Sequence, residues 1–141
     1  MALSTESIRA SVFVYILALW VVMAVIAVAN GVFRETVLIE RVGEYTGHVL
    51  STAMLVVAII VVAALYFGTT PIDYTQAELL AVGASWAILT VGFEFLVGFL
   101  EGTPPSETIA QYNVLAGQVW IVVPLTLLVA PLGVSWLSGQ L

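Results

Sequence analysis

The sequence predicts an all-α membrane protein: four transmembrane helices in an up-down-up-down bundle. First, 62% of the 141 residues are hydrophobic and only 9% are charged, whereas soluble domains are about 45–50% apolar. Second, four apolar runs are long enough to cross a hydrocarbon core about 30 Å thick, at residues 10–33, 48–67, 77–100 and 118–137. Third, these runs lack the alternation of polar and apolar residues that is typical of barrel strands. Their backbone must therefore satisfy its own hydrogen bonds by forming helices. We expect residues 1–141 to form a single domain of the cell membrane that crosses it several times.

The first span, 10–33, is expected to stay in the protein, because its apolar run is longer than the core of a signal peptide. A polar connection over 34–47 follows it. Side chains at helical spacing in this connection are Val37, Leu38, Arg41 and Val42. Either the first helix therefore continues beyond the membrane edge, or a short amphipathic helix lies in the interface. Gly43 and Gly47 are the expected helix stops.

The later elements are bounded by glycine and proline. Gly68 should end the second span, since Pro71 prevents its continuation. A break over 103–107, which contains Pro104 and Pro105, follows the third span. After it, a short helical segment over 107–115 is expected to lead into the fourth. Pro124 and Pro131 lie seven residues apart, on one face of the fourth helix, and should bend it.

Glu94 is the most informative residue, because it places a carboxylate inside the third apolar run. A charge at that depth costs about 2.5–3.5 kcal/mol on insertion scales, so it needs a partner, a proton or a water-filled cavity. Glu94 precedes Glu101 by seven residues, which puts it about 10 Å inside the interface. The long Arg34 side chain can reach it, so we expect a direct or water-bridged Arg34 to Glu94 ion pair. His48 and Tyr112 are expected as further partners.

Polar side chains gather at one leaflet of the predicted bundle, where Thr52 and Gln111 also lie. The candidates for binding a ligand or an ion are Asn30, Arg34, Glu35, His48, Ser51, Thr90, Glu94, Tyr112, Asn113 and Gln118. The opposite half carries few comparable residues besides Ser85, Ser135 and Ser138. Taken singly, most of these polar residues are typical of helix packing. Only for the charges of Arg34 and Glu94 does a functional role have the same weight as a packing role.

Two further patterns concern packing. A small and polar stripe expected to face the bundle comprises Gly83, Ala87, Thr90, Glu94 and Gly98. The tryptophans, expected to serve packing or an interfacial belt, are Trp20, Trp86, Trp120 and Trp136.

Composition excludes several functional classes. The chain has no cysteine, which removes disulfides, thiolate metal sites and Cys-x-x-Cys redox chemistry. A single histidine cannot supply paired axial haem ligands, so we expect neither a metal nor another cofactor. Beyond His48 no set of nucleophile, base and orienting group is visible, which makes an enzyme the less expected class. Nine acidic residues against three arginines and no lysine suit a high-salt archaeal cytoplasm and argue against nucleic acid as a partner.

Several motifs together resemble a family of small four-span prokaryotic membrane proteins whose function is uncharacterised. The motifs are Asn-Gly-x-x-Arg-Glu at 30–35, Phe-Glu-Phe at 93–95, Gly43 with His48 and Ser51, and Tyr112-Asn113 with Gly117 and Trp120. The family pattern has an acid before Tyr112 and an arginine after Gly117, whereas this chain has Gln111 and Gln118. The resemblance implies that the polar residues form a shared feature, and it implies no activity.

The leading interpretation is a small-solute or ion transporter or channel with a one-sided intramembrane polar site. Glu94 would be the exchangeable proton or cation site, and Arg34 would hold an anionic group or neutralise Glu94. Because four helices enclose little room, a homo-oligomer in the lipid bilayer is expected, with close-contact faces at Ala27-x-x-x-Gly31 and Ala81-x-x-x-Ser85. The alternative is a structural or accessory subunit of a larger membrane complex, in which the same polar cluster only fixes helix packing.

Overall fold

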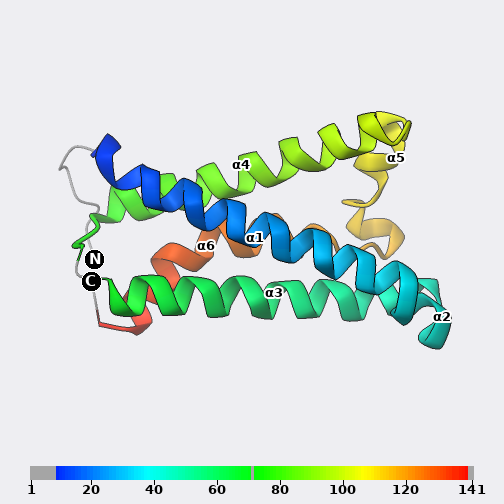
Figure 1. Ribbon diagram of the computed structural model, residues 1–141, viewed down its shortest axis with the longest axis horizontal. Coiled ribbons are helices and arrows are strands. Elements are labelled where there is room, and N and C mark those ends of the chain that lie inside the picture. The colour runs from blue at the N-terminus through cyan, green and yellow to red at the C-terminus, as the bar shows by residue number, and fades with distance from the viewer. Residues whose placement is uncertain (1–8, 71, 140–141) are drawn as a thin grey trace.

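The computed structural model describes residues 9–70 and 72–139, which form a bundle of long helices joined by short connections (Figure 1). In chain order the elements are η1 (Ala10–Val12), α1 (Phe13–Phe33), η2 (Arg34–Leu38), α2 (Ile39–Val42), α3 (Glu44–Thr69), α4 (Gln76–Leu100), α5 (Pro105–Ala110), η3 (Val114–Ala116) and α6 (Val122–Leu137). The long helices α1, α3, α4 and α6 run alternately in opposite directions, which confirms the all-helical bundle.

Within residues 9–70 and 72–139, three helical runs are long and apolar enough to cross a membrane, namely Ala10–Val42, Glu44–Thr69 and Gln76–Leu100. The fourth helix, α6, is apolar but has only 16 residues. At 1.5 Å per residue it measures about 24 Å, less than the hydrocarbon core of about 30 Å. If α6 crosses the membrane at full thickness, the backbone just before Val122 has to enter its depth without being α-helical.

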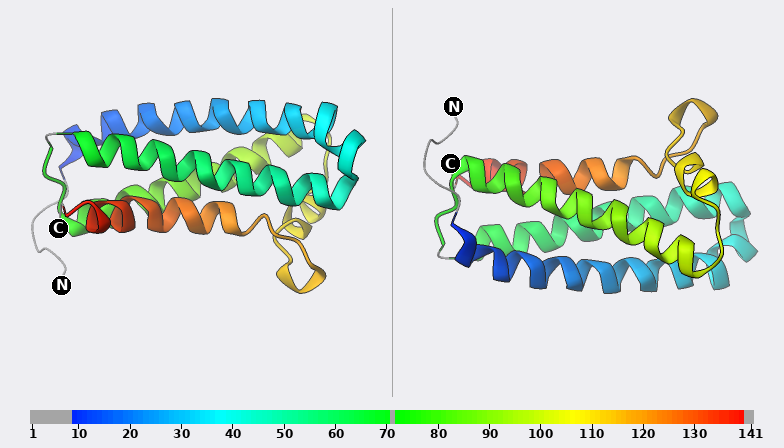
Figure 2. Two further views of the ribbon diagram at one scale, coloured as in Figure 1. Left: turned by 90° about the horizontal axis from the view of Figure 1, so that it is seen from below. Right: turned by 90° about the horizontal axis from the view of Figure 1, so that it is seen from above.

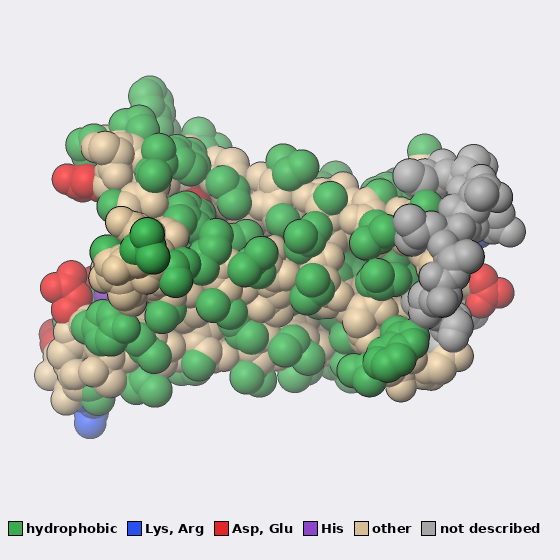
Figure 3. All heavy atoms as spheres, turned by 180° about the vertical axis from the view of Figure 1, so that it is seen from behind, with side chains coloured by type: hydrophobic (Ala, Val, Ile, Leu, Met, Phe, Trp, Pro, Cys, Tyr) green, Lys and Arg blue, Asp and Glu red, His purple; other side chains and the backbone are tan. Residues whose placement is uncertain are grey.

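The surface supports the membrane assignment. Figure 3 shows hydrophobic side chains over the middle of the body and acidic side chains at its two ends. Large apolar side chains point outward from three different helices, for example Val25 at 64% exposure, Leu65 at 64% and Ile88 at 71%. Many exposed apolar side chains of this kind are stable against lipid and unfavourable in water.

The first helix does not end at residue 33 but continues through the π-helical turn η2 to Val42, so continuation is the correct alternative. Gly43 ends it as predicted, with a φ of 89° that side chains other than glycine rarely adopt. The prediction that Gly47 is a second stop is wrong. Gly47 is buried inside α3, where a Cβ would lie 3.0 Å from the Ile39 Cγ1 atom. It allows close packing instead of ending a helix.

The other boundaries differ from the prediction by a few residues. The second long helix begins at Glu44, four residues before the predicted start, and Gly68 lies in its last turn. Pro71, the predicted breaker, is outside the described residues. Helix α4 begins within one residue of its predicted position, at a capping box formed by Thr75 and Glu78. Pro131 lies inside α6, and the bend expected of its two prolines stays a prediction.

The four long helices form a ring in which α1 packs on α3, α3 on α6 and α6 on α4, whereas α4 meets α1 at few points. At the tightest crossing a Cβ on Gly83 would lie 2.0 Å from the Leu128 carbonyl oxygen. This crossing confirms that Gly83, on the predicted stripe, faces the bundle. The apolar core of the ring includes Ile16, Leu55, Ile59, Phe67, Leu79, Val82, Trp86, Val123 and Leu127. Away from Gly83, α1 and α4 diverge toward α5 in the view of Figure 1. Figure 2 shows the connection after α5 projecting sideways from the bundle at that end.

Candidate functional site

A cavity of about 1020 Å³ lies at the α5 end of the ring. Its polar lining comes from η2, α3, α4 and α5 and from the residues just after α4 and α5, and it includes Arg34, Glu35, Glu44, His48, Thr90, Glu94, Glu101, Glu107 and Gln111. Its apolar lining, which continues toward the middle of the bundle, includes Trp20, Met23, Ala27, Leu55, Ile59, Phe93, Val123 and Leu127. The volume is that of a site for a small organic molecule, since such sites measure about 300–1,000 Å³.

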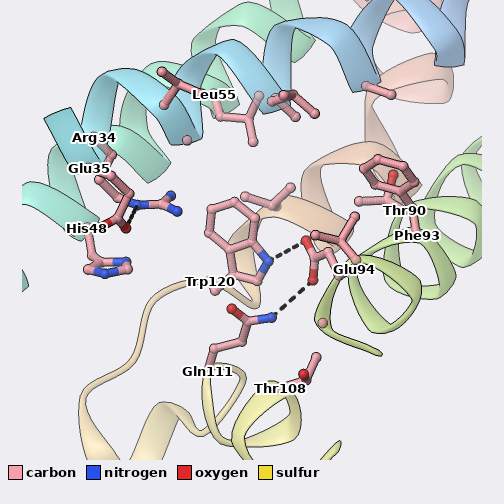
Figure 4. A pocket seen from close by; sticks show the side chains of 18 of the residues that line it. Arg34, Glu35, His48, Leu55, Thr90, Phe93, Glu94, Thr108, Gln111 and Trp120 are labelled. Atoms are coloured by element: carbon pink, nitrogen blue, oxygen red, sulfur yellow. Dashed lines mark hydrogen bonds and ion pairs between the residues drawn. The ribbon is translucent and has the colours of Figure 1, made fainter. Parts of the chain in front are cut away.

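Glu94 lies on the cavity wall, and three neutral groups donate hydrogen bonds to it (Figure 4). The Trp120 Nε1 atom donates to Oε1 at 2.5 Å, and the Gln111 Nε2 atom donates to Oε2 at 3.2 Å. The Tyr112 hydroxyl also donates to Oε2. In the described part of the chain no cation lies within ion-pair distance of this carboxylate. Three of the about four acceptor sites of the carboxylate are thus used, and the charge of Arg34 acts on it only from a distance, without an ion pair.

Tyr112, which was predicted as a Glu94 partner, is confirmed in that role. Burial and the hydrogen bond to Glu94 raise the pKa of Tyr112 above its usual value. The phenol therefore stays protonated at neutral pH and serves as a donor.

The expected direct ion pair between Arg34 and Glu94 is wrong. The Arg34 Nε atom is 3.3 Å from Oε1 of Glu35, and its Nη1 atom donates to the Ser51 hydroxyl at 3.3 Å. In the view of Figure 4 the Trp120 indole stands between the Arg34 guanidinium and the Glu94 carboxylate. Both charges line one cavity without touching each other, and a water-bridged contact stays a prediction.

Arg34 is positioned by a buried pair of polar residues that joins α1 to α3. The Asn30 Nδ2 atom donates to the Ser51 carbonyl at 3.1 Å, and the Ser51 hydroxyl donates to Oδ1 of Asn30 at 2.5 Å. Asn30 is 8% exposed and Ser51 is fully buried. These two candidates thus serve packing and hold the guanidinium, and they lie behind the cavity wall.

Thr90 and His48 line the cavity in different surroundings. The Thr90 hydroxyl accepts a hydrogen bond from Nε1 of Trp20 at 3.0 Å, and Trp20 meets Phe93 edge to face, with ring centroids 5.9 Å apart. His48 lies near Arg34 in Figure 4 and makes no hydrogen bond to Glu94, contrary to the expectation that it is a partner.

Two predicted site residues, Asn113 and Gln118, are exposed and lie outside the cavity lining. The connection folds back on itself there, with the Asn113 carbonyl accepting from the backbone N–H groups of Ala116 and Gln118. The prediction missed the role of Trp120 because it placed residue 118 at the start of a helix. In the structure the helix starts at Val122, and the non-helical segment turns the indole toward Glu94.

A second polar cluster, at the opposite end of the bundle, corrects the expectation that this half carries few polar residues. The Arg9 Nη2 atom is 2.7 Å from Oε1 of Glu78 and its Nε atom is 3.0 Å from Oε2, a two-pronged ion pair. The Glu78 side chain is fully buried and also accepts from the Thr75 N–H at 2.9 Å. Arg9 Nη2 further donates to the Asp73 carbonyl at 2.6 Å. This pair closes the end of the bundle remote from the cavity.

Comparison with known proteins supplies no relative: no family model, no curated protein and no solved structure matches the chain. The resemblance to a four-span family therefore stays a prediction, and the function has to be argued from the cavity.

Proposed function

We propose that the protein is a small transporter or channel-like protein, with the cavity beside Glu94 as its solute or ion site. The observation that carries this proposal is the environment of Glu94, a carboxylate within an apolar helix that borders a cavity and has only neutral donors. Ionisable residues at such a depth are costly and typically mark substrate or ion pathways. A carboxylate needed only for packing would be better served by a cation partner, as Glu78 is.

The backbone near Glu94 gives independent support. Glu94 lies six residues inside the end of α4 at Leu100, hence about 9 Å along the helix. Trp120, bonded to it, precedes the start of α6 and so is part of a non-helical segment at the same depth. Irregular backbone at membrane depth is tolerated where it lines a cavity, and broken helices commonly form the sites of transporters.

The two ends of the bundle differ as a one-sided site requires. Polar side chains surround the cavity at the α5 end, and Thr90 is the deepest polar side chain of α4 on its wall. Beyond it the bundle is filled by apolar residues such as Val82 and Trp86, both fully buried. The Arg9 to Glu78 pair then closes the far end. Glu94 would exchange a proton or cation with the open side, while Arg34, held by Ser51, sets the charge of the opposite wall.

An oligomer stays a prediction. Of the two faces expected to contact a second copy, the one with Ala27 and Gly31 lines the cavity. The alternative is that the chain is an accessory subunit of a larger complex. The experiment below distinguishes this alternative from the proposal.

The test is ion flux in liposomes that contain only this protein. Glu94→Gln keeps the shape and hydrogen-bonding capacity of the side chain and removes the charge. We expect the variant to assemble normally and to lose proton-coupled or cation-coupled flux. The matched control is Glu40→Gln, since Glu40 is exposed and outside the cavity lining. Equal flux in wild type and Glu94→Gln would contradict the proposal, as would absence of flux from a protein that purifies only within a larger complex.

A further inference from the structure

The charges around the cavity select the sign of its occupant. Five carboxylates line it against one guanidinium, and that guanidinium already pairs with Glu35. In the described residues no ion pair engages the other four acids, which are Glu44, Glu94, Glu101 and Glu107. Clefts lined by one sign of charge concentrate the opposite sign. The cavity therefore favours a cation over an anion.

The inner wall selects a different property. Below Glu94 the cavity is bounded by aromatic and aliphatic side chains, including Trp20, Phe93, Leu55 and Ile59. An inorganic ion gains little from such a wall, because apolar side chains supply no oxygen ligands to replace its water. An apolar body fills it favourably, and the faces of tryptophan rings attract organic cations. A volume of about 1020 Å³ is large enough for such a body beside the charge.

The cavity is also bordered by two helices whose outward surface is apolar. Helices α1 and α4 meet at few points and diverge toward α5, and the cavity is lined by residues of both. Val28 and Val32 of α1 line it and are still 53% and 58% exposed. An amphiphile dissolved in the bilayer reaches this junction without passing through water.

From these three observations we infer that the site takes a hydrophobic organic cation from the bilayer, with Glu94 as the counter-ion and the Trp20 and Phe93 rings against the apolar body. The inference rests on the proposed function and names the substrate class of the same site.

Tetraphenylphosphonium and tetraphenylborate test it, because they have the same shape and opposite charge. Binding is measured by equilibrium dialysis with wild-type protein in lipid nanodiscs, and empty nanodiscs correct for partitioning. We expect saturable binding of the phosphonium at least tenfold tighter than that of the borate, and little binding of tetramethylammonium, which lacks the apolar body. Glu94→Gln should weaken phosphonium binding at least tenfold, and Glu40→Gln should leave it unchanged.

The inference would be overturned if the two tetraphenyl ions bound equally well, or if neither bound. This comparison uses the wild-type protein alone. Tight binding of tetramethylammonium would overturn the requirement for an apolar body. In each case Glu94-dependent flux of protons or inorganic cations would leave the proposed function standing. If the phosphonium bound as expected but flux did not depend on Glu94, the proposed function would be contradicted.

The lateral route has its own test. Val28→Trp adds bulk on the cavity side of α1, whereas Val25→Trp adds the same bulk on an exposed face outside the lining. We expect the first variant to slow association of the phosphonium severalfold and the second to leave it unchanged. Equal association rates in the two variants would show that the ligand does not enter between α1 and α4.

Discussion

Two glutamates of one helix show how the surroundings of a residue decide its role. Glu78 is fully buried and its carboxylate faces both prongs of the Arg9 guanidinium. Glu94 borders a cavity and accepts only from neutral groups. The first arrangement fixes the geometry of a helix end, and the second leaves a carboxylate that an external cation can approach. Residue type and helix are the same in both, so the different roles that we propose for the two glutamates rest on their neighbours.

The Arg9 to Glu78 pair leads to a prediction about stability. Arg9→Lys keeps the positive charge but loses the two-pronged geometry, so the buried carboxylate loses at least one charge-assisted hydrogen bond. Such a bond contributes about 1.5–3 kcal/mol. We expect a lower midpoint of thermal unfolding for Arg9→Lys, with little change in Glu94-dependent flux. Arg41→Lys, at an exposed position, is the control. Equal stability of the two variants would mean that the pair contributes nothing beyond its charge.

At the scale of elements, the position of the cavity follows from how closely each pair of helices packs. Gly83 brings α4 against the backbone of α6 at Leu128, and α4 then diverges from α1 toward α5. The fourth helix starts late, at Val122, which leaves Trp120 on a non-helical segment that reaches Glu94. A tight crossing at one end and a short helix at the other thus create the room that the site occupies.

The crossing predicts a large difference between two glycine substitutions in α4. Gly83→Ala would place a Cβ 2.0 Å from the Leu128 carbonyl oxygen, so the helices must separate. Overpacking of this kind typically costs about 1–3 kcal/mol. Gly92→Ala meets no atom within 4 Å and should be neutral or slightly stabilising, since alanine is the better helix former. Thermal unfolding in a mild detergent measures both. Similar midpoints for the two variants would contradict the crossing.

At the scale of the whole molecule, the two ends of the bundle are filled differently. The α5 end holds the acidic cavity, and the other end holds the closed ion pair and the aromatic cluster of Phe67, Tyr74 and Trp86. Polar residues attract water only where a cavity admits it. Depth along the bundle is therefore a poorer guide to accessibility than membership of the cavity wall.

Single cysteines test this difference, because the native chain has none. A membrane-impermeant maleimide added from the α5 side should label Glu35→Cys at the rim and Thr90→Cys within the cavity. Ser51→Cys should stay unlabelled, since Ser51 is fully buried although it lies at the same end. Ser135→Cys, buried toward the far end, is the second protected control. Labelling of Thr90→Cys and Ser135→Cys to the same extent would indicate a continuous pore, and labelling of neither site a closed bundle.

The sequence alone determined the helical class, the bounds of α4 to within one residue and the position of a carboxylate, Glu94, that needs polar partners within an apolar helix. These features depend on hydrophobic periodicity and on the cost of a charge in an apolar run, and both are properties of a local stretch of chain. The contact between Tyr112 and Glu94 was also predicted from the sequence, because the alternating helix directions put both residues at the same end of the bundle.

Only the tertiary structure decided which side chains meet. Arg34 pairs with Glu35 and Ser51 instead of Glu94, and Trp120 takes the place expected for a cation. Arg9 reaches Glu78 across sixty-nine residues of sequence. Such pairings depend on the rotation and inclination of each helix and on the non-helical turn before Val122. No local period encodes these quantities, because they are set by close contacts between segments far apart in the chain, such as the one at Gly83.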